Sequence, residues 1–165
     1  MGTKDQATCA DRVLEAKDSR LEDLLDIKDR KGVYRSIYND DMRETIYQYP
    51  LWVDYVEPNT FDDQLIGYLR YQISWGGPAE EIRIYVVKDR KGVYRSTCSE
   101  FWFMDWFDGA YVYLDEPETK LVKWAMLVWY QEHLKEELMT GRGKDSQSRK
   151  ALIKLGEILI DTFKK

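Results

Sequence analysis

The feature that most constrains the fold is a series of four runs in which apolar and polar residues alternate along residues 65–115. The runs cover residues 68–75, 82–87, 93–102 and 110–114 and are rich in β-branched and aromatic side chains, which is typical of β-strands. The joints at 76–78, 89–92 and 108–109 are short and contain glycine, so neighbouring strands are expected to run antiparallel. The sequence therefore predicts a four-stranded meander, with Asp108-Gly109 as its last hairpin turn.

Apolar residues recur at helical spacing on both sides of these runs. Residues 7–26 have one apolar face, and after Pro117 the helical period returns as far as about Met139. A polar, glycine-containing segment at 141–148 predicts a mobile linker before a last helix capped by Ser146 or Ser148. We expect an α+β fold: an N-terminal helix, a four-stranded antiparallel meander and two C-terminal helices packed on the sheet.

The length of 165 residues is that of a single domain, which we expect to span residues 1–165. Within it, residues 1–36 hold a helix and a loop, residues 37–116 an acidic and aromatic β region, and residues 117–165 a helical part. The sequence contains no long apolar run and its first residues are polar, so we expect a cytoplasmic protein without membrane contact. Cys9 and Cys98 are expected to be reduced thiols.

A nine-residue segment, Lys-Asp-Arg-Lys-Gly-Val-Tyr-Arg-Ser, occurs identically at 28–36 and 88–96. The flanking residues share almost nothing, which is unlike a repeat architecture, whose similarity extends over the whole period. Alternating runs surround the second copy, so it predicts a β-hairpin. The first copy follows a helix and predicts an exposed loop or short hairpin outside the main sheet.

Acidic residues are concentrated in the middle of the chain. The net charge is −5, but residues 37–116 carry 15 acidic and 7 basic residues together with 18 of the 23 aromatic residues. A negative field repels nucleic acid and attracts basic protein surfaces, although the same charge also serves solubility. The candidate partner-binding residues are Asp40, Asp41, Asp62, Asp63, Glu100, Asp105, Trp106, Asp108, Asp115, Glu116 and Glu118.

The segment from Phe101 to Phe107 is unusually aromatic. As a strand it places Trp102, Met104 and Trp106 on one face and Phe101, Phe103 and Asp105 on the other. Two largely apolar faces indicate either a core strand or an exposed aromatic anchor ringed by carboxylates, as at protein–protein hot spots.

Signals for catalysis are weak in this sequence. His133 is the single histidine, no nucleophile–base pair is evident, and glycine-rich phosphate loops are absent, so we expect no cofactor and no enzyme activity. The alternative hypothesis is a divalent-metal-dependent nuclease or phosphodiesterase, in which a hairpin gathers Asp105, Asp108, Asp115 and Glu116 as oxygen ligands.

Two motifs, Ser74-Trp-Gly-Gly-Pro78 and Phe103-Met-Asp-Trp-Phe-Asp-Gly109, lie about thirty residues apart. Together they resemble small uncharacterised proteins of phages and mobile elements, over roughly residues 64–115. The resemblance implies a setting in which small acidic inhibitors of host nucleases are common, and hence an anti-CRISPR or anti-restriction role.

The sequence as a whole favours a non-enzymatic binding or inhibitor protein. We expect its acidic, aromatic surface to block a basic surface of a host protein, such as the groove of a nucleic-acid-binding enzyme, since carboxylates compete with phosphates for arginine and lysine. A homodimer formed through the C-terminal helix is a further hypothesis.

Overall fold

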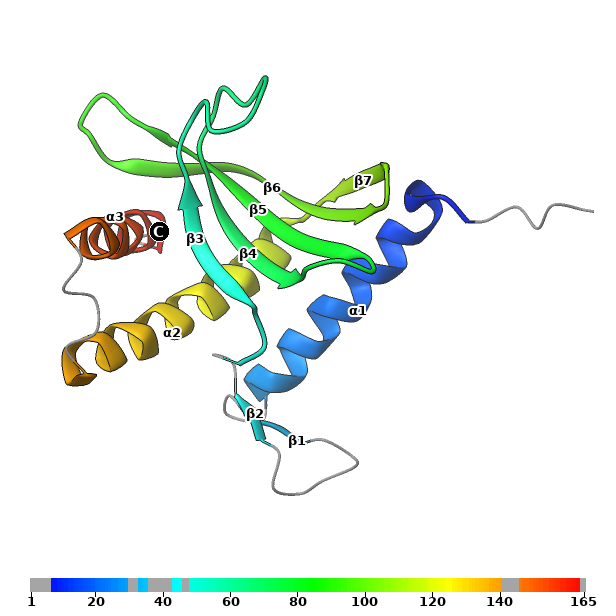
Figure 1. Ribbon diagram of the computed structural model, residues 1–165, viewed down its shortest axis with the longest axis horizontal. Coiled ribbons are helices and arrows are strands. Elements are labelled where there is room, and N and C mark those ends of the chain that lie inside the picture. Colours follow the sequence, from blue (N-terminus) through cyan, green and yellow to red (C-terminus); the bar gives the residue numbers. More distant parts are fainter. Residues whose placement is uncertain (1–6, 30–32, 36–42, 46–47, 141–145, 164–165) are drawn as a thin grey trace, which may run out of the picture.

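The computed structural model describes residues 7–29, 33–35, 43–45, 48–140 and 146–163. Its elements are, in order, α1 (Cys9–Asp29), β1 (Val33–Arg35), β2 (Arg43–Thr45), β3 (Trp52–Val56), β4 (Tyr68–Ser74), β5 (Ala79–Lys88), β6 (Tyr94–Asp105), β7 (Asp108–Tyr113), α2 (Glu116–Thr140) and α3 (Ser146–Phe163). Strands β3 to β7 form an antiparallel meander in sequence order, while β1 and β2 pair separately (Figure 1). The α+β class is confirmed.

The main sheet has five strands, so the prediction of four was wrong. The additional strand is β3, which pairs with β4 so that Val53 lies opposite Tyr71 and Asp54 opposite Arg70. Only Val53 and Val56 of β3 are buried, and this spacing of three hides the alternation that identifies a strand. A cross-strand ion pair holds β3 against β4, since Arg70 donates to both carboxylate oxygens of Asp54 at 2.9 and 2.7 Å.

The last hairpin turn also differs from the prediction. Asp105 pairs with Asp108 and Met104 with Gly109, so the two turn residues are Trp106 and Phe107, and Asp108-Gly109 begins β7 instead. The reason lies outside the hairpin, because this register brings the Asp108 carboxylate to the first backbone N–H of α1. Trp106 therefore does not belong to the strand in which the alternation placed it.

The two copies of the nine-residue segment adopt different structures. In the second copy, Lys88 ends β5, Gly92 N–H donates to Asp89 C=O at 3.0 Å, and Tyr94 begins β6, so the predicted hairpin is confirmed. In the first copy, Lys28 and Asp29 end α1, and the described strand that follows, β1, lies outside the main sheet, as expected. The first two residues of the segment thus end a helix in the first copy, whereas Lys88 ends a strand and Asp89 begins a turn in the second; the Tyr-Arg dipeptide is extended in both copies.

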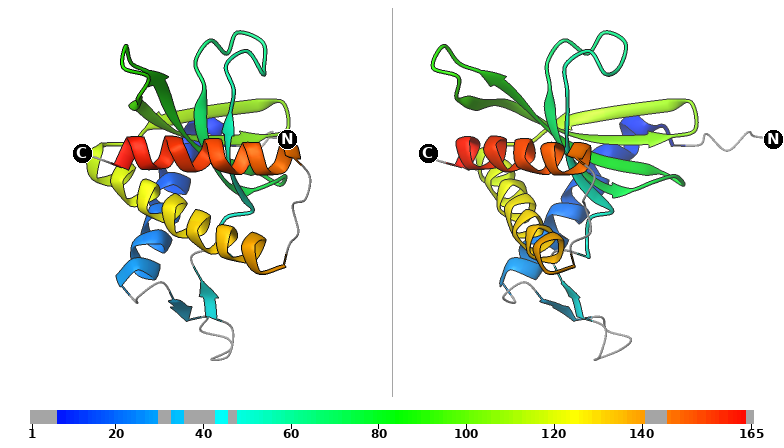
Figure 2. Two further views of the ribbon diagram at one scale, coloured as in Figure 1. Left: turned by 90° about the vertical axis from the view of Figure 1, so that its left-hand side faces the viewer. Right: turned by 60° about the vertical axis from the view of Figure 1, so that its left-hand side comes forward.

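One face of the sheet is covered by all three helices (Figure 2). Apolar residues of β3 to β7 meet apolar residues of α1, α2 and α3 in one core. The largest fully buried side chains are Tyr68, Tyr71, Phe101, Leu24, Ile27, Leu69, Ile82, Ile84, Met126, Ile158 and Leu159. The opposite face carries the alternate side chains of each strand, and none of the described helices lies on it (Figure 2).

Helix α3 begins inside the segment predicted to be a linker. Residues 146–148 already belong to α3, which begins at Ser146, and residues 141–145 lie outside the described part of the chain. Leu155, Ile158 and Leu159 of α3 are buried, whereas Ile153 and Ile160 are exposed. The homodimer through this helix stays a prediction.

A buried hydroxyl provides a test of the core. Tyr71 is fully buried, and its hydroxyl has no hydrogen-bond partner among the described residues. Burial raises the pKa of Tyr71 well above its ordinary value. Because an unsatisfied buried hydroxyl costs about 1–3 kcal/mol, we expect Tyr71→Phe to raise the free energy of unfolding by about 1 kcal/mol in urea titrations.

Tyr49→Phe is the matched control. The Tyr49 hydroxyl donates to Asp23 Oδ2 at 2.7 Å, so its removal should lower the free energy of unfolding by about 1 kcal/mol. A loss of stability in Tyr71→Phe similar to that in Tyr49→Phe would show that the Tyr71 hydroxyl is satisfied.

Candidate functional site

The end of the sheet where β4 meets β5 and β6 meets β7 carries three exposed large aromatic side chains. Trp106 and Phe107 in the β6–β7 turn are 93% and 104% exposed, and Trp75 in the β4–β5 turn is 77% exposed. Pairing of Ala79 with Met104 places the two turns at the same end, on the right in Figure 1, where α1 begins. We call Trp75, Trp106 and Phe107 the aromatic tip.

Trp106 is held in an unfavourable backbone conformation. Its φ is +55°, in the left-handed region, whereas Phe107 is not among the positive-φ residues of the structure. A positive φ at only the first of two turn residues is the pattern of a type II′ hairpin turn, which favours glycine at this position. A bulky residue in such a conformation costs about 1–3 kcal/mol, a cost that its own burial does not offset.

The base of this hairpin is fixed by α1. Asp108 Oδ2 accepts the backbone N–H of Cys9 at 2.8 Å, and Asp108 Oδ1 accepts that of Gly109 at 3.0 Å. Arg12 forms an ion pair with Asp105 at 2.9 Å and lies over the Phe103 ring, 4.7 Å from its centroid. The hydrogen bond from Cys9 N–H lowers the pKa of Asp108, and burial raises the pKa of the Cys9 thiol. Two predicted site carboxylates, Asp105 and Asp108, thus position the aromatic tip.

The carboxylates at the start of α2 also have partners inside the protein. Asp115 and Glu118 each accept the other's backbone N–H, at 2.8 and 2.9 Å, which is a capping box. Glu118 also pairs with Lys17 of α1 at 2.9 Å, and exposed Glu116 pairs with Lys120 at 3.1 Å. These predicted site residues begin a helix and join it to α1.

Glu100 lies on the face of the sheet that the helices leave open, and it is buried. It accepts hydrogen bonds from the Tyr85 hydroxyl at 2.9 Å and from Trp102 Nε1 at 2.7 Å. Arg83, directly opposite in β5, is held between the rings of Tyr68 and Trp102, at 5.0 and 4.2 Å from their centroids. Burial and the bond to Glu100 raise the pKa of Tyr85 to about 12, against a lowering effect of Arg83. This network orders the open face.

The remaining predicted site residues lie elsewhere. Asp62 and Asp63 are exposed in the β3–β4 loop, at the opposite end of β4 from Trp75, and Asp40 and Asp41 fall outside the described residues. Of the predicted set, the structure therefore brings Asp105, Trp106 and Asp108 together. Sequence reasoning missed Phe107, which it assigned to a strand, and Trp75, whose signal is its place just before Gly76-Gly77.

The carboxylates required by the metal hypothesis are far apart. Asp105 and Asp108 lie at one end of β7, and Asp115 and Glu116 follow its other end, roughly 20 Å along the strand. Within the described ranges, no group of three or more histidine, cysteine, aspartate or glutamate side chains is arranged to hold a metal ion. The described helices likewise include none that is long and apolar enough to cross a bilayer.

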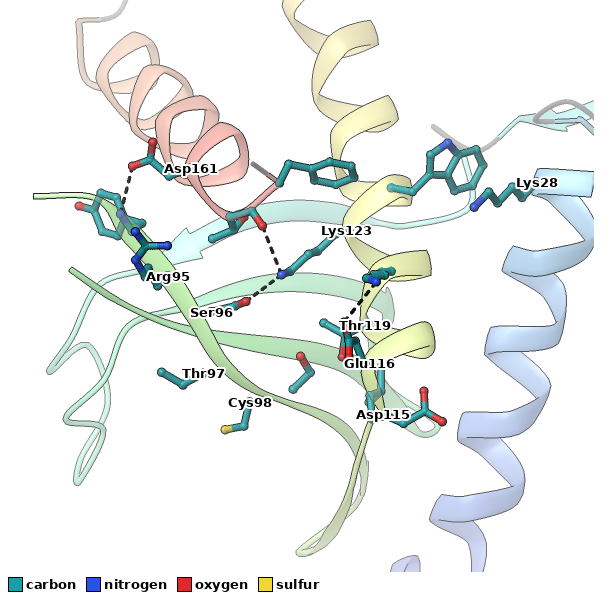
Figure 3. A pocket seen from close by; sticks show the side chains of 17 residues that line it. Lys28, Arg95, Ser96, Thr97, Cys98, Asp115, Glu116, Thr119, Lys123 and Asp161 are labelled. Carbon is teal, nitrogen blue, oxygen red and sulfur yellow. Dashed lines mark hydrogen bonds and ion pairs between the residues drawn. The ribbon is translucent and has the colours of Figure 1, made fainter. Parts of the chain in front are cut away.

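A cavity of about 690 Å³ lies between β6, α2 and the end of α3 (Figure 3). Lys123 points across it and donates to Ser96 Oγ at 2.7 Å and to Thr162 C=O at 3.4 Å. Asp161 accepts the Tyr94 N–H at 3.0 Å, and Lys28 lies over the Trp124 ring. Lys123, Asp161 and Lys28 are thus each engaged by another group of the cavity wall. No pattern in the sequence predicts this cavity, because its walls come from distant segments.

Known protein families, curated proteins and solved structures contain no match to this chain. Its own geometry is therefore the basis for a functional conclusion.

The contact between Asp108 and α1 predicts a response to acid. The pKa of Asp108 is lower in the folded protein than the ordinary 3.8, so its contribution to stability is present above about pH 4 and lost as the pH falls through the folded pKa. We expect Asp108→Asn, which cannot titrate, to lose less stability than the wild type between about pH 5 and about pH 2 in urea titrations.

Asp62→Asn serves as the control, because this carboxylate is exposed in the β3–β4 loop. It should retain the acid dependence of the wild type. The assignment is contradicted if Asp108→Asn does so as well.

Proposed function

We propose that this chain is a non-enzymatic binding protein that docks its aromatic tip on a basic surface of another protein and blocks that surface. The observation that carries the proposal is the Trp106-Phe107 pair, fully exposed and strained on a hairpin that α1 holds in place. Strained residues at exposed positions point to function, since folding alone would select glycine at this turn.

The residue types at the tip suit protein recognition. Tryptophan and phenylalanine bury large areas on contact, and tryptophan is prominent among residues that contribute most to binding energy. A hairpin held by α1 loses little conformational entropy when a partner binds, which favours affinity. Binding would also remove from water three large side chains that the free protein leaves exposed.

The charge of the molecule favours a basic partner. Residues 37–116 have an excess of acidic over basic residues, and the chain as a whole carries −5. At the tip, Arg12 neutralises Asp105, whereas the described donors to Asp108 are uncharged, two backbone N–H groups and the Cys9 thiol, so its negative charge is kept beside Trp106. Opposite charge accelerates association and selects against acidic partners.

The finer hypothesis is that the partner is a nucleic-acid-binding enzyme of a host, inhibited in the manner of an anti-CRISPR or anti-restriction protein. Support for it comes from the acidic composition and from the resemblance of residues 64–115 to phage proteins, and it stays a prediction.

Stability and binding should respond in opposite directions to one substitution. Trp106→Gly removes the strain of a bulky residue at positive φ, and it loses little buried surface because the indole is almost fully exposed. We therefore expect the free energy of unfolding to rise by about 1 kcal/mol. Circular dichroism during urea titration measures this change. A decrease in stability would mean that the indole contributes to the fold and would remove the observation on which the proposal rests.

The binding test uses a matched pair of double variants. One combines Trp106→Gly with Phe107→Ser at the tip, and the other combines Phe61→Ser with Leu65→Ser in the β3–β4 loop, where both side chains are also exposed. In capture experiments from a bacterial lysate, proteins retained by the wild type should be lost by the first variant and kept by the second.

Retention should also weaken steeply with added salt, because exposed charges are screened beyond about 8–10 Å at physiological ionic strength. Equal retention by both variants, or retention that does not change with salt, would refute the proposal.

A further inference from the structure

The outer edge of β7 is unpaired in the described structure. β7 is the last strand of the main sheet and pairs only with β6. The pairing runs through six consecutive residue pairs, from Asp105–Asp108 to Glu100–Tyr113, without a register shift. The ladder between β6 and β7 is therefore free of bulges over the whole of β7, and the edge begins directly at the β6–β7 turn of the aromatic tip.

The register determines which backbone groups point outwards. Asp105 and Asp108 close a two-residue turn as a hydrogen-bonded pair, and bonded pairs alternate along an antiparallel ladder. Asp108, Ala110 and Val112 therefore bond to β6, and Leu114 N–H continues the pattern by donating to Ser99 C=O at 2.9 Å. Gly109, Tyr111 and Tyr113 direct their N–H and C=O groups away from β6.

Two of the outward N–H groups lack partners. Gly109 N–H donates to Asp108, whereas no described residue accepts a hydrogen bond from the N–H of Tyr111 or Tyr113. The side chains of Tyr111 and Tyr113 are 43% and 63% exposed, and Tyr111 stacks on Trp102 with ring centroids 4.8 Å apart. The edge thus presents two outward N–H groups, those of Tyr111 and Tyr113, that no described residue accepts, beside the stacked rings of Tyr111 and Trp102.

The β7 edge lacks several of the features that normally protect a sheet edge from pairing. Natural edges are blunted by lysine, proline, bulges, short length or a covering helix. β7 contains no lysine, arginine or proline, and tyrosine and valine alternate in its centre. A helix packs against each edge strand, α1 against β7 and α3 against β3, and β3 is shorter and carries the Asp54–Arg70 ion pair. What makes β7 available for a further strand is that the N–H groups of Tyr111 and Tyr113 point away from β6 and have no acceptor among the described residues.

We infer that β7 accepts an extended segment of the partner as a sixth strand, and that this segment has basic residues on both sides of a β-forming centre. This inference rests on the proposed function and names how the partner binds beside the aromatic tip. Strand addition of this kind derives affinity from backbone hydrogen bonds and specificity from alternate side chains.

The charges at the two ends of β7 select the occupant. Asp108 at one end and Asp115 just beyond the other are exposed, and exposed Glu116 beside Asp115 pairs with Lys120. A second copy of β7 could pair antiparallel with the first, with Tyr111 opposite either Tyr111 or Tyr113 of the other copy. In both registers each Asp108 lies opposite or next to these carboxylates. Like charges that face each other across a strand pair are destabilising, so a second copy is disfavoured. Lysine or arginine at the ends of a partner segment places opposite charges there instead.

The test uses a synthetic peptide of about ten residues, with alternating valine and threonine in the centre and two lysines at each end. Hydrogen exchange followed by NMR should show the amides of Tyr111 and Tyr113 exchanging fast in the free chain and at least about tenfold more slowly with the peptide bound. A matched peptide with glutamate ends should bind at least about tenfold more weakly. Unchanged exchange at both amides under saturating peptide would overturn the inference.

A pair of variants distinguishes the contribution of the Tyr113 backbone N–H to peptide binding from that of its side chain. Tyr113→Pro removes an outward N–H without removing a bond to β6, as edge strands tolerate, and Tyr113→Ala keeps the N–H. We expect the proline variant to bind the basic peptide at least about fivefold more weakly than the alanine variant. Equal affinity would overturn strand addition, and the exchange measurement on the unmodified chain decides the matter if the proline variant does not fold.

Two further measurements keep this inference distinct from the proposed function. The tip variant Trp106→Gly with Phe107→Ser should still show protection of Tyr111 and Tyr113 by the basic peptide, so loss of captured proteins and loss of edge pairing are separate results. Sedimentation equilibrium should give the same mass for the wild-type chain and for Tyr113→Pro, because the inference assigns the β7 edge to a partner and not to a second copy. A dimer that Tyr113→Pro dissociates would overturn the basic partner and assign the edge to a second copy.

Discussion

The covering of one face of the sheet by three helices is the constraint on which the rest of the structure depends. The strands of the meander together place a layer of apolar side chains on one face of the sheet that must be removed from water, and α1, α2 and α3 supply the apolar surface that covers it. Because all the helices lie on one side, the strand ends, the open face and the β7 edge remain for contact with other molecules. These are the places to which the proposed function and the edge inference refer.

Most of the acidic side chains that mark the sequence are used to assemble this arrangement. Asp108 fixes the first turn of α1, Asp115 and Glu118 begin α2, and Glu100 orders the open face through Tyr85 and Trp102. A carboxylate that accepts backbone N–H groups at a helix start both stabilises the helix and keeps its negative charge. The acidic composition therefore contributes twice, to folding through hydrogen bonds and to the field that surrounds the aromatic tip.

Strain and exposure coincide at the hairpin that α1 holds. The residue with the least favourable backbone conformation, Trp106, is also among the most exposed, and its neighbour Phe107 is fully exposed. A fold selected only for stability would place a small residue there, since glycine adopts a positive φ without cost. The edge of β7 begins at the same hairpin, so the strained tip and the unpaired strand form one continuous surface at one side of the molecule.

The sequence by itself determined the elements whose signal is periodic and local. Alternation identified β4 to β7, helical spacing identified α1, α2 and α3, and together they defined the α+β class. It did not determine β3, whose two buried valines are spaced too irregularly, nor the turn at Trp106-Phe107, where Asp108-Gly109 has the better local chemistry. The tertiary structure decided these points, and it decided which carboxylates remain available, because the contacts responsible join residues as distant as Cys9 and Asp108 or Lys17 and Glu118. The same is true of the first residues of the nine-residue segment, since exposed Lys28 and Asp29 continue the helix that precedes them, whereas Lys88 continues the strand β5.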